Sequence, residues 1–224
     1  MLRDLVEAAL NQVLLSGAIP NAQVNSTLAF WRDRWTSDIL PKNLPPIGGP
    51  SGISPLAPAA RFAESLGSNN YRDNLLPVAA SINAVKGRIF NRRAPTAVDR
   101  FEDLVDSAAT LAVFNYLNDP ELGREQFLNT RQRVRTQTRL IESNMPDAGR
   151  LLAFFDKFWE DYLTTIENEA ETWLIEQIGY ARELFEEIRD PNGNRPDSYR
   201  FVMDTLDDMQ RQIDEGAARF PRGQ

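Results

Sequence analysis

The stretch TAVDRFEDLVDSAATLA, residues 96–112, decides the fold class. Its apolar side chains recur at intervals of three and four residues, at Val98, Phe101, Val105, Ala108, Leu111 and Ala112. That spacing places them on one face of an α-helix. Thr96 is a suitable N-cap, and Asp99 three residues later resembles a weaker form of the capping box. We therefore predict an amphipathic helix that begins at about Thr96.

Helical spacing continues through most of the chain. Further helices are predicted over residues 2–14, 24–35, 74–91, 119–143, 146–189 and from 196 onward, with the first two as an antiparallel pair. Residues 36–60 contain six prolines and three glycines, which predicts a long loop because these residues interrupt helices. No stretch alternates as a strand would. The sequence thus predicts an all-α protein.

Composition removes several classes of function. The 224 residues include 25 Lys and Arg against 32 Asp and Glu, a net charge of −7, and neither cysteine nor histidine. Disulfides, Cys or His metal sites and histidine-dependent nucleophiles are excluded. No apolar run approaches the length of a membrane span. Asp4 and Glu7 interrupt what would be the apolar region of a signal peptide, so we expect a protein that is not secreted.

The charges are distributed unevenly. Residues 61–100 carry seven basic and three acidic side chains, whereas residues 141–224 carry nine basic and nineteen acidic ones. The segment KGRIFNRR, residues 86–93, places four cations at a helix end and in the following turn. These cations either complement the helix dipole or line a phosphate site. Both interpretations remain open at this point.

Other charged groups have simpler explanations. Arg131, Arg135 and Arg139 share a helix face with Arg133 beside them. They could follow a nucleic-acid backbone, but we expect them to pair with the acidic C-terminal region. Two sets of carboxylates could suggest metal chemistry, but neighbours in each set point to different helix faces: Asp204, Asp207 and Asp208, and Glu167, Glu169 and Glu171. We therefore predict no catalytic site, no metal and no cofactor. The aromatic stripe is predicted to be core: Phe154, Phe155, Phe158, Trp159 and Tyr162.

Several short motifs occur in the order of a known family. VKGRI at residues 85–89 is similar to Thr-Arg-Asn-Arg-Ile, PTA at 95–97 to Pro-Thr-Thr-Ala, VDSAA at 105–109 to Val-Asp-Asp-Ala-Thr, and REQF at 124–127 to Arg-x-x-Phe-Glu. SP at 54–55 followed by RF at 61–62 also resembles a benyvirus segment. With these motifs the chain resembles the coat proteins of rod-shaped plant RNA viruses, the tobamovirus and benyvirus-like group. Leu128 and Ser107 depart from the family pattern.

The resemblance implies a four-helix bundle over residues 1–130, followed by an acidic helical extension over 131–224. It implies a coat protein that forms a helical rod around single-stranded RNA, located in the virion and in the host cytoplasm during assembly, with no membrane partner. By position, Arg124 and Phe127 would form a structural motif. The RNA-binding residues it implies are Lys86 and Arg88, with Arg92, Arg93 and Arg100 as helpers and Asp106 and Ser107 beside the RNA.

Two other classes are weighed against this expectation. A non-enzymatic helical scaffold whose acidic tail binds a basic partner predicts a monomer or small oligomer without nucleic acid. An enzyme that uses paired carboxylates and a metal predicts magnesium-dependent activity that is lost on changing Asp207 or Asp208.

Overall fold

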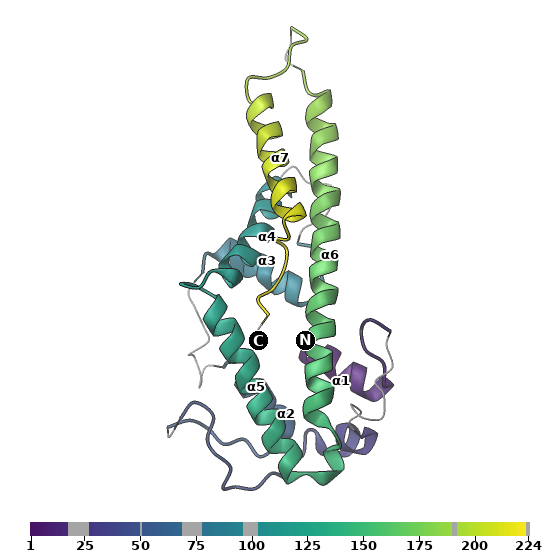
Figure 1. Ribbon diagram of the computed structural model, residues 1–224, viewed down its shortest axis with the longest axis vertical. Helices are drawn as coiled ribbons and strands as arrows, with labels where there is room; N and C mark the ends of the chain where they lie inside the picture. The colour runs from purple at the N-terminus through teal and green to yellow at the C-terminus, as the bar shows by residue number, and fades with distance from the viewer. Residues whose placement is uncertain (18–26, 50, 69–77, 96–102, 190–191, 223–224) are drawn as a thin grey trace. The chain divides into compact units, whose positions relative to one another are not determined.

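A computed structural model describes residues 1–17, 27–49, 51–68, 78–95, 103–189 and 192–222 (Figure 1). The helices in these ranges are α1 (Leu2–Asn11), α2 (Pro58–Leu66), α3 (Ala80–Phe90), α4 (Asp103–Asn118), α5 (Arg124–Asn144), α6 (Leu151–Glu187) and α7 (Tyr199–Asp214), with a π-helical turn η1 (Phe30–Arg34) and a 3₁₀ turn η2 (Pro146–Ala148). Extended pairing in the same ranges is limited to one bridge between Ile47 and Ile53. The predicted all-α class is confirmed.

The chain divides into two compact units. Unit 1 comprises Met1–Pro77, Pro120–Thr165 and Arg222–Gln224, and unit 2 comprises Val78–Asp119 and Ile166–Pro221. The expected division at residues 130 and 131 does not coincide with these units, because that point lies inside the continuous helix α5. α2 packs on α5 in unit 1 and α3 packs on α4 in unit 2. A single four-helix bundle over residues 1–130 therefore stays a prediction.

Unit 1 has a core of aromatic rings. Their centroids lie 4.5 to 5.9 Å apart in tilted and edge-to-face arrangements. Aromatic pairs prefer such arrangements because the edge of one ring is attracted to the face of the other. The members are Phe30, Trp31, Trp35, Phe62, Phe154, Phe155 and Trp159. Phe158 and Tyr162 are also buried, so the predicted core role of the aromatic stripe is confirmed. The Asp161 carboxylate accepts the Ser16 N–H at 2.9 and 3.1 Å and attaches the segment after α1 to α6.

Arg61 holds the proline-rich loop of unit 1 against its helices. The Arg61 side chain is fully buried, and its Nε donates to Gln137 Oε1 of α5 at 2.5 Å. Its Nη2 donates to the Pro45 carbonyl in the loop. No carboxylate among the described residues pairs with it, and burial lowers the pKa of the guanidinium. One buried cation thus joins the loop, α2 and α5.

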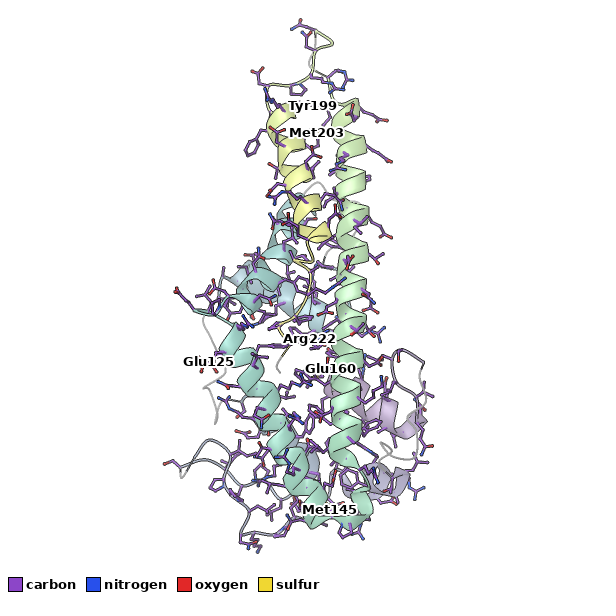
Figure 2. All side chains as sticks on the ribbon, in the orientation of Figure 1. Glu125, Met145, Glu160, Tyr199, Met203 and Arg222 are labelled. Atoms are coloured by element: carbon purple, nitrogen blue, oxygen red, sulfur yellow. The ribbon has the colours of Figure 1, made fainter. Side chains whose placement is uncertain are left out.

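Unit 2 combines the α3–α4 pair with a helical hairpin of α7 and the second part of α6 (Figure 1). The hairpin buries Leu174, Ile178, Leu206, Met209 and Ile213, and Arg182 pairs with Asp207 at 2.7 Å. At the turn of the hairpin, the hydroxyl of Tyr199 (labelled in Figure 2) donates to Glu186 at 2.6 Å. That hydrogen bond lowers the pKa of Glu186 and raises the pKa of Tyr199.

Several predicted helix bounds are corrected. The loop predicted to reach residue 60 ends earlier, since α2 begins at Pro58, a position where a missing N–H costs no helical bond. The fifth helix begins at Arg124 rather than at Asp119, because residues 120–123 form a turn and Gly123 is the N-cap. α3 begins at Ala80, and the final helix at Tyr199. The predicted cap at Thr96 and the first three residues of the predicted second helix, 24–26, lie outside the described residues, and the described part of that helix contains the π-helical turn η1.

Candidate nucleic-acid interface

The end of α3 forms a tight basic turn in unit 2. α3 ends at Phe90, and Arg92 adopts a left-handed conformation with φ 53°. The Arg93 N–H donates to the Arg88 carbonyl at 3.0 Å and the Arg92 N–H to the Ile89 carbonyl at 2.9 Å, which reverses the chain. This reversal places the side chains of Arg88, Arg92 and Arg93 at the surface of one short segment.

Arg88 and Arg93 are exposed and available to an anion. Arg88 donates one Nη1 hydrogen bond to the Pro95 carbonyl, which orients the guanidinium and leaves its other N–H donors for a ligand. Arg93 forms no ion pair with any residue in the described part of the chain. Two oriented or free guanidinium groups five residues apart suit bidentate contact with phosphate oxygens.

Lys86 occupies a different environment from the expected one. Its side chain is half-buried, and its Nζ lies 6.0 Å from the centre of the Tyr116 ring. Burial lowers the pKa of the Lys86 ammonium, because the charged form loses hydration. Lys86 is thus less accessible to a ligand at the surface than Arg88 and Arg93, which are both exposed.

Arg92 is engaged by an acidic residue of α6. Its Nη2 lies 2.5 Å from Glu169 Oε1, and its Nε donates to both carboxylate oxygens at 3.1 and 3.2 Å. Next to this pair lies an open pocket of about 450 Å³, whose walls also include Arg93, Trp173 and Glu176. Two arginines and two glutamates balance in charge, so the pocket itself does not favour phosphate.

The remaining expected RNA contacts divide into three cases. Ser107 is fully buried and its hydroxyl has no hydrogen-bond partner among the described residues, so it does not reach a ligand at the surface and is left out of the interface. Asp106 lies in α4, but its side chain is not among those described. Arg100 lies outside the described residues.

Residues of α5 make their contacts within unit 1. Arg124 is exposed at the start of the helix, and the Phe127 ring lies 5.9 Å from the Trp159 ring. Arg131 pairs with Glu160 at 2.6 Å, and Arg135 pairs with Asp156 at 2.7 Å. The predicted pairing of these arginines with downstream acids is confirmed for both.

The six carboxylates considered for metal chemistry have separate partners. Glu167 accepts the Phe220 N–H at 2.6 Å, Glu169 binds Arg92, and Glu171 binds Arg219 at 2.6 Å. Asp207 binds Arg182, Asp208 binds Arg211 and Gln212, and Asp204 lies 3.9 Å from Arg200. Within the described ranges, no group of three such side chains is arranged to hold a metal ion. None of the helices described there is long and apolar enough to span a bilayer.

Sequence reasoning missed one feature of the basic turn. Gly87 lies inside α3, is exposed, and a Cβ built on it would contact nothing within 4 Å. Glycine costs a helix interior about 0.5–1 kcal/mol relative to alanine, and no neighbour among the described residues requires the small size of Gly87. The sequence contains a signal for this feature, because a glycine lies between the cations Lys86 and Arg88 inside a predicted helix.

Comparisons with known proteins add no further constraint. No protein-family model matches the chain, and no curated protein and no solved structure is significantly similar to it. The function is therefore inferred from the residues and from their geometry.

Proposed function

We propose that this protein is a non-enzymatic coat protein that polymerises into a helical rod around single-stranded RNA. The observation that carries the proposal is the exposed pair Arg88 and Arg93 at the end of α3, neither of which pairs with an acidic side chain among the described residues. The order of short motifs around this turn supports the same assignment. A coat subunit needs few such cations, because the many subunits of a polymer bind one strand together.

Gly87 supports a close contact at the same place. Because Gly87 has no side chain, nothing projects from the exposed face of α3 beside Arg88, and a sugar-phosphate backbone can approach the helix closely. Phosphate contacts of this kind carry no base information, so RNA binding is largely independent of sequence.

The acidic excess of the protein lies in α6, α7 and the segments beside them, of which Glu169 contacts the turn at Arg92. Residues 166–221 hold fourteen acidic and six basic side chains, a net charge of −8, whereas the rest of the chain carries a net charge of +1. Acidic hairpins repel both phosphate and one another at neutral pH. RNA is therefore expected on the α3 side, and assembly is expected to strengthen as salt screens the hairpins.

The first prediction tests the arginine pair. The double substitution Arg88→Ala and Arg93→Ala removes two phosphate contacts from every subunit, so RNA affinity should fall by about ten-fold or more at moderate salt. Binding to a fluorescent single-stranded RNA is measured by anisotropy at several salt concentrations.

The control is a second double variant that removes the same amount of positive charge at sites distant in sequence from the end of α3. Arg3→Ala with Arg200→Ala removes two arginines that are 77% and 92% exposed. This variant should keep most of the wild-type RNA affinity. Equal losses in the two double variants would mean that binding depends on total charge and would contradict an interface at the end of α3.

The second prediction concerns Gly87. Gly87→Ala should raise the free energy of unfolding by about 0.5–1 kcal/mol, because alanine favours the helix and meets no neighbour. The same substitution should weaken RNA binding by crowding the approach to α3. Urea denaturation and RNA anisotropy on one sample measure both effects. Gly179→Ala, at an equally open site in α6, should stabilise the protein and leave RNA binding unchanged.

A scaffold function is the second candidate. The observation that favours it is the concentration of acidic charge in the hairpin of α6 and α7, which suits a basic partner. This candidate predicts a monomer or small oligomer that purifies without nucleic acid. Sedimentation with and without RNA separates the two functions.

A further inference from the structure

The last described residues of unit 2 form an arm that packs away from its own helix. We define the arm as Ala217–Pro221, which follows α7. Figure 1 shows it running from the end of α7 alongside α6. Ala218 and Phe220 are buried, and the Phe220 ring lies 5.2 Å from Phe90 of α3 and 5.0 Å from Phe114 of α4. The arm is therefore part of the core of unit 2, although it forms no helix.

Polar groups of two other helices fix the backbone of the arm. Glu167 of α6 is buried and accepts the Phe220 N–H at 2.6 Å, and Asn118 at the end of α4 donates to the Arg219 carbonyl at 2.6 Å. Glu171 of α6 pairs with the Arg219 guanidinium at 2.6 Å. We call Phe90, Phe114, Asn118, Glu167 and Glu171 the arm site. A buried carboxylate on a backbone N–H makes this site selective for one register of the arm.

A single glycine, Gly216, connects the arm to α7. Gly216 has φ 85°, a conformation that favours glycine, and a Cβ built on it would meet nothing within 4 Å. The Gly216 and Ala217 N–H groups cap the end of α7 by donating to Ile213 and Gln212. These hydrogen bonds satisfy the C-terminal end of α7. The arm can therefore change direction at Gly216 while α7 stays helical.

We propose that, in the assembled protein, the arm of one copy fills the arm site of the next copy. This inference rests on the proposed self-assembly and names a contact by which it occurs. An exchanged arm makes the same bonds to Glu167, Asn118 and Glu171 as an arm in its own subunit. Exchange therefore changes only the backbone conformation at Gly216. Each copy donates one arm and receives one, which is a head-to-tail contact; such a contact extends into a filament when the rotation between copies does not close a ring.

The test uses the absence of cysteine from the sequence. One full-length variant carries Asn118→Cys in the arm site, and a second carries Arg219→Cys in the arm. The two are mixed, assembled with single-stranded RNA and treated with a short bismaleimide. Because neither chain alone holds both thiols, a product that links N118C to R219C forms only across two copies. In an equal mixture about half of the R219C arms meet an N118C site, so we expect up to about half of the chains in such dimers, identified by mass spectrometry of the linked peptides.

A chain that carries both cysteines extends the test. N118C with R219C in one chain should give a ladder of linked multimers after assembly and mainly internally linked monomers in dilute, unassembled samples. The control pair Arg182→Cys and Asp207→Cys lies within the hairpin and should link only within one chain in both samples. If the Asn118→Cys variant unfolds, Glu171→Cys replaces it, since Glu171 contacts the same arginine.

The outcomes distinguish this inference from the coat proposal. Rods that contain RNA but yield only internally linked monomers would overturn arm exchange and leave the coat function in place. Failure to form any assembly would overturn the coat function, and arm exchange with it. Linked dimers in assemblies and not in dilute samples would establish the exchange.

Discussion

Replacing Arg61 with alanine is expected to lower the free energy of unfolding by about 2–5 kcal/mol. Arg61 is fully buried, so its loss leaves a large cavity in unit 1. It also leaves Gln137 Oε1 and the Pro45 carbonyl without their donor. The proline-rich loop loses its attachment to α2 and α5. Urea denaturation followed by tryptophan fluorescence reports on this unit, because Trp31 and Trp35 lie in its core.

Two further variants separate the contributions at this position. Arg61→Met keeps much of the buried volume and removes a charge whose burial is unfavourable, so its loss of stability should be smaller than that of Arg61→Ala. Arg32→Ala removes an arginine whose side chain is 73% exposed and should change stability by no more than about 0.5 kcal/mol. An Arg61→Ala protein as stable as the Arg32→Ala protein would contradict the assigned role of Arg61.

Truncation of the arm's aromatic ring is the second large effect. Phe220→Ala should cost about 3–5 kcal/mol, because the ring is 3% exposed and packs on both Phe90 and Phe114. Amide hydrogen exchange should show the loss of protection in α3 and α4. Phe201→Ala is the matched control, since Phe201 is 74% exposed and its loss should change stability by no more than about 0.5 kcal/mol. Unchanged protection in Phe220→Ala would show that the arm does not stabilise unit 2.

The helical class could be predicted from the sequence because apolar spacing repeats over long segments. The pairing of Arg131 and Arg135 with acids of α6 followed from charge distribution alone. The basic turn was also visible as a cluster in sequence. Each of these features depends on neighbours in the chain or on total charge, which a sequence displays directly.

Features that depend on distant contacts could not be predicted. Nothing local distinguishes Arg61 from an exposed arginine, since its burial depends on Pro45 and Gln137, sixteen and seventy-six residues away. Glu169 similarly neutralises Arg92 across seventy-seven residues. Ser107 was expected beside RNA on the strength of a motif, yet the packing of unit 2 buries it. The arm lacks helical spacing, and its buried state depends on Phe90 and Phe114.

The RNA content of the assembled wild-type protein tests the central claim most directly. The protein is purified without added nucleic acid, sedimented, imaged by negative stain, and digested with ribonuclease before its ultraviolet absorbance is measured. The coat function predicts rods whose absorbance shows RNA that resists ribonuclease while the rods are intact and is released when they are dissociated. A protein that stays a monomer or small oligomer, with and without RNA and across salt concentrations, would contradict it.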